Sequence, residues 1–229
     1  MEDQPEAAAG RAPGLREVKK ARTRLAISDI ATRLFAEHGF ERVTLAQIAA
    51  EAEVSVKTVL NYFPTKEDLF FDRADELLAG LRRTIADRPE GATIAHGLER
   101  LLRDDLVPFP GTGWAMLRDP AGYEGYRSFV ATEHASPTLR ARRLVIAEAW
   151  AVDLAGFLAD ELGLPADDPR PQGFASMIVA VLSVRDRVLS RAMLERASAR
   201  TVERRVKAVV TDAVARLARA YEDLDRPRG

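Results

Sequence analysis

The sequence predicts an all-α protein, with a three-helix helix-turn-helix domain at its N-terminus and a larger helical domain after it. Apolar residues recur at intervals of three and four along most of the chain, and two short helical segments between residues 44 and 63 are joined by a tight turn. The chain has 229 residues, 47% of them hydrophobic, which is enough to bury a core in each domain. We expect a disordered tail over residues 1–15, the small domain over 16–64, the larger domain over 65–223 and a short tail over 224–229.

The small domain can be divided into helices by its capping residues. The first helix is expected from about residue 17 to residue 38, before Gly39, and should bury Leu25, Ile27, Ile30, Leu34 and Phe35. Thr44 and Gln47 form a T-x-x-Q capping box that starts the second helix, and Ser55 is a typical N-cap for the third. The gap between these two helices is too short for antiparallel packing but suits the crossing of about 90–120° in a helix-turn-helix motif.

Beyond this motif the chain is expected to be almost entirely helical. Thr65 caps a helix that continues to about Asp87, and Pro and Gly residues break the helical pattern between residues 108 and 125. Apolar periodicity predicts further helices over residues 91–106, over 126–162 with an interruption near Ser136 and Pro137, over 172–196 and over 201–223.

Charge is distributed unevenly along the chain. The formal net charge is −1, yet residues 11–24 contain six basic residues and one acidic residue, Glu17. Such a segment next to a helix-turn-helix motif favours attraction to DNA phosphates. The alternative is that it is a solvated helix end, which is the more common meaning of a charged run.

Other classes of protein are disfavoured by what the sequence lacks. Cysteine is absent, so disulfides and thiolate metal sites are excluded. We expect a cytoplasmic protein without membrane contact, because neither a signal-peptide pattern nor an apolar stretch of about 18 residues is present. Common nucleophile, phosphate-binding and zinc motifs are missing, and the histidines His38, His96 and His134 are dispersed, so no enzyme activity, metal or cofactor is expected.

Residues 20–72 resemble the tetracycline-repressor (TetR) family of transcriptional regulators. The resemblance is carried by the runs ARTRLAISDIATRLFAEHGFERVTLAQIA, EVSVKT and NYFPTKEDLF. Two positions depart from the family pattern: Glu53 stands in the turn where Gly is usual, and Leu60 stands where an aromatic residue, often Tyr, is usual. The resemblance implies a homodimeric regulator, expected to be a repressor, that binds a palindromic operator and is released by a small-molecule effector.

Residues at the start of the third helix are the expected readers of DNA. Lys57 has the best donor geometry for a base, particularly guanine, although it can equally contact phosphate, and Val56 can touch a thymine methyl. The resemblance implies backbone contacts by Thr44, Tyr62 and Lys66; for Tyr62, packing against the first helix is an equal alternative. The predicted DNA-contacting residues are Arg22, Arg24, Thr44, Leu45, Ala46, Ser55, Val56, Lys57, Thr58, Asn61, Tyr62 and Lys66.

The larger domain is expected to form the dimer and to hold the effector. The resemblance implies that the helices over 172–196 and 201–223 pair with their symmetry mates, through Ile178, Leu182, Arg185, Val206, Val210 and Leu217, although most of these stripes should be intramolecular core. An apolar or aromatic effector is expected beside the Gly- and Pro-rich segment. The predicted ligand-binding residues are Trp114, Met116, Tyr123, Tyr126, Phe129, Trp150 and Phe157; at each of them plain core packing is the alternative.

A protein of another class stays open beside the regulator. An all-helical ligand-binding or adaptor protein with a degenerate, non-functional helix-turn-helix would also fit, because Glu53 and Leu60 both depart from the expected pattern. Binding to a specific DNA sequence separates the two hypotheses.

Overall fold

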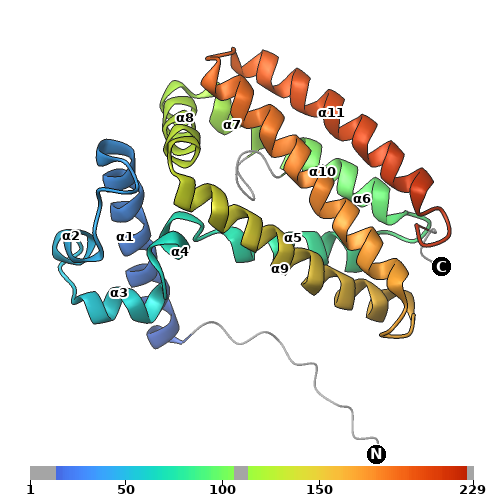
Figure 1. Ribbon diagram of the computed structural model, residues 1–229, viewed down its shortest axis with the longest axis horizontal. Coiled ribbons are helices and arrows are strands. Elements are labelled where there is room, and N and C mark those ends of the chain that lie inside the picture. Colours follow the sequence, from blue (N-terminus) through green and yellow to red (C-terminus); the bar gives the residue numbers. More distant parts are fainter. Residues whose placement is uncertain (1–13, 106–112, 226–229) are drawn as a thin grey trace, which may run out of the picture.

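A computed structural model describes residues 14–105 and 113–225, and all regular structure in this part of the chain is helical. Residues 1–13 of the expected N-terminal tail and residues 226–229 of the expected C-terminal tail lie outside the described residues. Figure 1 shows two helical domains connected through α4. The N-terminal domain consists of α1 (Leu15–His38), α2 (Leu45–Glu51) and α3 (Val56–Tyr62). The remaining elements are α4 (Lys66–Phe70), α5 (Ala74–Ala86), α6 (Ile94–Arg100), the π-helical turn η1 (Leu101–Asp105), α7 (Gly113–Arg118), α8 (Pro120–Ala135), α9 (Pro137–Leu162), α10 (Pro169–Leu194) and α11 (Ala199–Ala220).

The predicted caps of the N-terminal domain are confirmed. The Thr44 hydroxyl accepts the Gln47 amide at 3.2 Å while the Gln47 side chain accepts the Thr44 amide at 2.8 Å, which completes the capping box of α2. The Ser55 hydroxyl accepts the Thr58 amide at 3.0 Å and begins α3. In α1, Ile27, Leu34 and Phe35 are buried and Ile30 is partly buried, but Leu25 is exposed, so its predicted burial is wrong. Helical spacing gave the correct face for Ile27, Leu34 and Phe35, whereas Leu25 lies on the exposed side of the helix.

One expected helix is broken in two. The sequence predicted a continuous helix from residue 65 to residue 87, but α4 ends at Phe70 and α5 begins at Ala74. Two side chains of α1 bind Asp72 at this break. The Nη2 atom of Arg24 donates to the Asp72 carbonyl at 3.0 Å, and the Ser28 hydroxyl donates to the Asp72 carboxylate. Burial of this carboxyl group raises the pKa of Asp72, and the Ser28 hydroxyl opposes the shift by binding the charged form. The backbone at the break is therefore stabilised by tertiary contacts that local helix propensity does not reveal.

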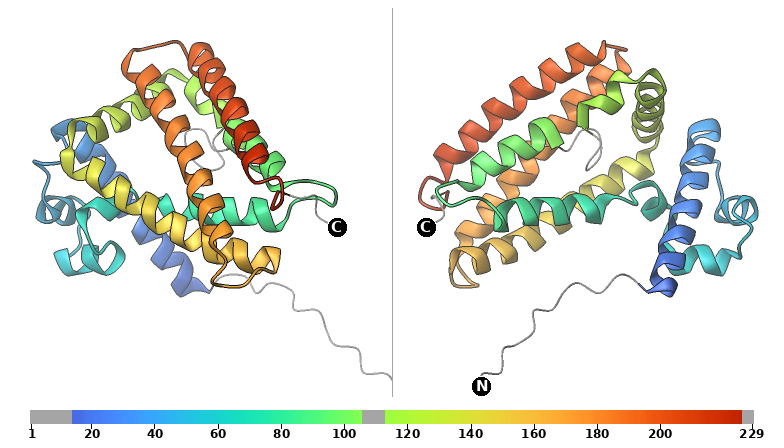
Figure 2. Two further views of the ribbon diagram at one scale, coloured as in Figure 1. Left: turned by 45° about the vertical axis from the view of Figure 1, so that its right-hand side comes forward. Right: turned by 180° about the vertical axis from the view of Figure 1, so that it is seen from behind.

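The C-terminal domain is built around α10. This helix lies between α9 and α11 and contacts both of them and α8 (Figure 2). Helix α5 packs against α9, and α6 packs against α11. Because α10 packs against neighbours on several sides, many of its side chains are buried rather than a single stripe. None of the described helices combines the length and the apolar character needed to cross a lipid bilayer.

Helix boundaries in the C-terminal domain were partly predicted. The interruption at Ser136 is confirmed, because Ser136 caps α9 by accepting the Leu139 amide at 3.1 Å. The helix expected over 91–106 starts only after Thr93, which caps α6, and ends as the π-helical turn η1. The segment 108–125 is more regular than predicted: α7 and α8 begin within it, with Asp119 capping α8 and Pro120 in the first turn, where proline is compatible with a helix.

Phe70 joins the cores of the two domains. Its ring lies 6.1 Å from that of Phe35 and 6.2 Å from that of Phe40 in the N-terminal domain, measured between centroids. On its other side it stacks on Phe129 of α8 at 4.3 Å, and Phe129 stacks in turn on Tyr126 at 5.9 Å. A continuous row of aromatic rings therefore connects α1, α4 and α8.

The turn between α2 and α3 carries backbone strain that a substitution can relieve. Glu53 has φ of +53°, a left-handed conformation that costs a residue with a Cβ atom energy. We predict that Glu53→Gly raises the free energy of unfolding by roughly 0.5–1 kcal/mol, since the gain is partly offset by the greater freedom of Gly in the unfolded chain. Chemical denaturation measures this change. The matched control is Gly39→Ala, at φ of +79°, which should lower stability; a loss of stability in both variants would contradict the assignment of strain to Glu53.

Candidate nucleic-acid interface

The outer face of α3 carries four exposed side chains in two rows. Val56 and Leu60 form an apolar row, and Lys57 and Asn61 form a polar row beside it, each pair one helical turn apart. On the inner face Val59 is fully buried. The helix is therefore fixed from behind and leaves its outer side chains available for contact.

Most of the other predicted contact residues lie at the starts of α2 and α3. Thr44 and Ala46 are exposed and Leu45 is partly buried at the beginning of α2. Ser55 is exposed, and its hydroxyl is 2.8 Å from that of Thr58, so both polar groups take part in the cap. Ser55 and Thr58 therefore lie at the N-terminal end of α3, and the other three residues lie at that of α2.

Two residues predicted to contact DNA, Lys66 and Arg24, are partly buried and bind groups inside the domain. The Lys66 ammonium donates to the carbonyls of Phe40 at 2.9 Å and Val43 at 3.0 Å, and it lies 4.2 Å from the centre of the Phe40 ring. The Arg24 guanidinium lies 4.3 Å from the ring centre of Phe63 and donates to carbonyl oxygens at both ends of the segment that joins α3 to α5. Both cations bind backbone carbonyls that no helix satisfies.

Tyr62 and the basic segment remain at the surface to different degrees. Tyr62 is partly buried, and its backbone carbonyl accepts a hydrogen bond of 3.1 Å from Arg24. The backbone of Tyr62 therefore has a structural role that does not depend on its phenol group. Arg16, Lys19, Lys20 and Arg22 are exposed in the first two turns of α1. Arg22 thus keeps the accessibility that its predicted role needs, in contrast to Arg24.

Leu60 is the surface residue that the prediction omitted. Its side chain is exposed one turn after Val56, on the same side of α3. The spacing of four between the two residues places them on one side of the helix and would have identified Leu60. Asn61 was predicted to contact DNA because its side chain can form hydrogen bonds to bases, which that of Leu60 cannot.

The six residues predicted to form the dimer interface lie inside the single chain. Each of them is at most 3% exposed within the core between α10 and its neighbours. Arg185, the one charged member, pairs with Asp186 at 3.2 Å. Their assignment to a surface between two chains is therefore wrong: the apolar stripes of α10 and α11 face each other and the rest of the domain. The residues in question are Ile178, Leu182, Arg185, Val206, Val210 and Leu217.

The seven residues predicted to bind an effector lie in the core of the C-terminal domain or pack against it. Tyr126 and Phe129 belong to the aromatic row, and the Phe157 ring lies 5.6 Å from the Arg82 guanidinium. The Tyr123 hydroxyl donates to the Ala197 carbonyl at 2.6 Å, so its hydrogen bond stays within the protein. Met116 and Trp150 are partly buried against the same core, which also contains Trp114. These surroundings match the core-packing alternative at each position.

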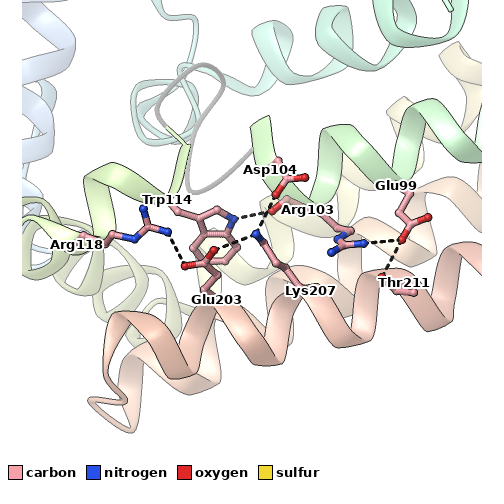
Figure 3. Close-up of polar contacts among 8 residues, drawn as sticks. All are labelled: Glu99, Arg103, Asp104, Trp114, Arg118, Glu203, Lys207 and Thr211. Carbon is pink, nitrogen blue, oxygen red and sulfur yellow. Dashed lines mark hydrogen bonds and ion pairs between the residues drawn. The ribbon is translucent and has the colours of Figure 1, made fainter.

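Figure 3 shows Trp114 of α7 beside residues of η1 and α11. Its indole nitrogen donates to the Arg103 carbonyl at 2.6 Å, and the Lys207 ammonium lies 5.9 Å from the ring centre. Lys207 forms ion pairs with Asp104 at 3.0 Å and Glu203 at 2.9 Å, and both partners raise the pKa of Lys207. The network fixes α11 to the two elements that flank the undescribed residues 106–112.

The structure also contains an open groove that the sequence did not predict. It lies between the end of α10 and the beginning of α11 and is lined by Val188, Arg191, Glu195, Arg205, Ala208 and Val209. Ion pairs of Glu195 with Arg191 and with Arg205 span one side of it and lower the pKa of the Glu195 carboxyl group. None of the residues predicted to bind an effector lines this groove.

Comparison with known proteins identifies the N-terminal domain. The model of the bacterial regulatory proteins of the tetR family matches residues 27–72, which span the second half of α1, the helix-turn-helix and α4. The regulator TcmR of Streptomyces glaucescens is 29% identical over 182 residues, which cover 78% of this chain and 76% of TcmR. The helix-turn-helix domain of this chain is therefore of the tetR-family type.

Other relatives match this chain over shorter regions. HbdR of Aromatoleum sp. (strain CIB) is 39% identical over 33% of this chain, and LuxR of Vibrio harveyi is 46% identical over 26%. These alignments span about a third of each relative, 32% of HbdR and 31% of LuxR. The solved SmeT–triclosan complex has a similar fold, with a TM-score of 0.52 and 21% identity over 90% of this chain and 95% of that chain.

The structural roles of the two inner cations can be separated from the surface role of Lys57. We predict that Lys66→Met and Arg24→Met each lower the free energy of unfolding by about 1–3 kcal/mol, because charged hydrogen bonds to otherwise unsatisfied carbonyls are lost. Lys57→Met should change it by less than about 0.5 kcal/mol, as is usual for an exposed residue. Denaturation in urea distinguishes the three variants. Equal stability of Arg24→Met and Lys57→Met would show that Arg24 does not support the fold.

Proposed function

We propose that this protein is a DNA-binding transcriptional regulator of the tetR family that reads an inverted-repeat operator as a homodimer. The observation that carries the proposal is the outer face of α3, where two rows of exposed side chains stand on a helix fixed from behind by buried residues. A helix of this width fits the major groove, and a rigid support holds its side chains in register with the bases.

The side chains of α3 divide the work of recognition. Lys57 donates to a base acceptor such as the O6 and N7 atoms of guanine, and Asn61 is suited to adenine one turn later. Thr44 and Ser55 lie at the starts of α2 and α3, where contacts to the DNA backbone would set the position of the domain without reading sequence. Base contacts and backbone contacts together place the recognition helix at the same position in each operator half-site.

The start of α1 supplies charge attraction that depends little on sequence. Arg16, Lys19, Lys20 and Arg22 are exposed in a segment that precedes the helix-turn-helix. Cations in such a position neutralise phosphates and release counterions, which makes binding depend on salt. The near-neutral total charge of the chain is compatible with this role, because the attraction is local.

Dimerisation is proposed through the exposed apolar residues of α9 and α10. A single recognition helix covers only a few base pairs, so a palindromic operator requires two copies related by a two-fold axis. Leu144, Val145 and Val152 on α9 are each more than half exposed, and Met177 on the adjacent α10 is also exposed. A second copy would remove this apolar surface from water, which favours association.

The proposed regulator also responds to a small apolar or aromatic effector that binds beside α8 and repositions it. The aromatic row supports this mechanism: Tyr126 lies in the C-terminal core, while Phe129 stacks on Phe70 of α4. A displacement of α8 would reach α4 and change the spacing of the two recognition helices. The effector needs only a different affinity for the two spacings, about 1–3 kcal/mol, to release the operator.

Selection of DNA fragments from a random pool tests the DNA-binding function. The expected result is an inverted repeat bound by the wild-type protein, with Lys57→Ala weakening binding by about 1–3 kcal/mol while the free energy of unfolding is unchanged. Arg204→Ala, an exposed cation on α11, is the matched control and should bind like the wild type. If no fragment is selected at low salt, where phosphate attraction is strongest, the alternative of an adaptor protein with a non-functional helix-turn-helix is favoured.

Sedimentation tests the proposed dimer surface. We expect a dimeric wild type, and a shift toward monomer in Val152→Glu, because a buried unpaired charge is costly. Val18→Glu is the matched control: Val18 is 50% exposed, against 59% for Val152, but it lies on α1 in the other domain. A monomeric wild type would refute the dimer, and an unchanged dimer in Val152→Glu would place the interface elsewhere.

A further inference from the structure

The apolar row on α3 is the feature of the DNA-facing surface that hydrogen bonding does not explain. Val56 is 38% exposed and Leu60 is 40% exposed, although both belong to a seven-residue helix whose inner face already supplies the buried Val59. The two side chains project from the same side of the helix, with Cβ atoms roughly 5–6 Å apart at this spacing. The structure therefore places an apolar strip in the middle of the proposed reading surface.

The chemistry of the major groove restricts what such a strip can recognise. Adenine, guanine and cytosine present hydrogen-bond donors and acceptors there, and covering these groups with a leucine would leave them unpaired. Thymine alone among the four bases presents a methyl group, on C5. An apolar side chain that touches this methyl group removes apolar surface of both partners from water.

We propose that Leu60 and Val56 are specificity-determining residues that read thymine methyl groups in each operator half-site. Bases on one strand are spaced about 3.4 Å apart, so two side chains roughly 5–6 Å apart would meet thymines one or two steps from each other. Lys57 and Asn61 read the hydrogen-bonding edges of neighbouring bases in the same groove. This inference rests on the proposed DNA-binding function and adds the class of base that the apolar row selects.

Replacing thymine by uracil in the selected operator tests the inference directly, because this change removes the C5 methyl group and keeps the base-pairing groups. For the wild type, single deoxyuridine substitutions should weaken binding about fourfold at one or two thymines per half-site, equivalent to roughly 0.8 kcal/mol for one methyl-sized group. Leu60→Ala should bind the thymine operator several-fold more weakly and lose the response to deoxyuridine at the thymine that Leu60 contacts.

The control variant is Leu194→Ala, because Leu194 is 37% exposed, close to the exposure of Leu60, and lies at the end of α10. It should show the same pattern of deoxyuridine responses as the wild type. Circular dichroism and urea denaturation confirm that Leu60→Ala is folded, which its exposed position favours.

Each remaining outcome has a defined meaning. If the wild type binds its operator equally well with thymine and with uracil at all positions, the inference is wrong while the DNA-binding function stands. If Leu60→Ala keeps the full response at every thymine, Leu60 is not the reader. If no DNA is selected at all, the proposed function fails, and the inference fails with it.

Discussion

The position of Phe70 is the constraint on which the arrangement of the two domains depends. A five-residue helix, α4, is too short to be stable alone, so its geometry must come from packing. Phe70 supplies that packing by contacting Phe35 and Phe40 of one domain and Phe129 of the other. Aromatic pairs of this kind contribute about 0.5–1.5 kcal/mol each beyond the area they bury. The small domain thereby contacts the large one through the Phe70 ring.

The same region explains why two cations, Arg24 and Lys66, are partly buried. Short helices and tight turns leave many backbone carbonyls without helical partners, and Lys66 and Arg24 satisfy four of them. Each cation also lies over an aromatic ring, which gives a further attraction. A basic residue near a DNA-binding motif is therefore not by itself a phosphate ligand; where the chain has few regular hydrogen bonds, the backbone competes for it.

Local features could be predicted from the sequence, and features that depend on distant partners could not. The caps at Thr44, Ser55 and Thr65 involve residues three positions apart, so their side chains alone determine them. The break after Phe70 depends on Arg24, 48 positions before Asp72, and no local pattern contains that information. Periodicity likewise showed that Ile178 and Val210 lie on the apolar faces of their helices, but it could not show which apolar positions are covered within one chain.

The departures from the family pattern have different physical consequences. Glu53 occupies a left-handed position, so it costs stability without changing the outer surface of α3. Leu60 has the opposite character: it is exposed and leaves the fold undisturbed, but it replaces a polar tip by an apolar one on the reading face. Only four side chains of α3 are exposed on its outer face, so the replacement of one of them changes a quarter of the side chains available for contact. Neither departure disrupts the helix-turn-helix geometry, because the strain at Glu53 is local and the Leu60 side chain is exposed.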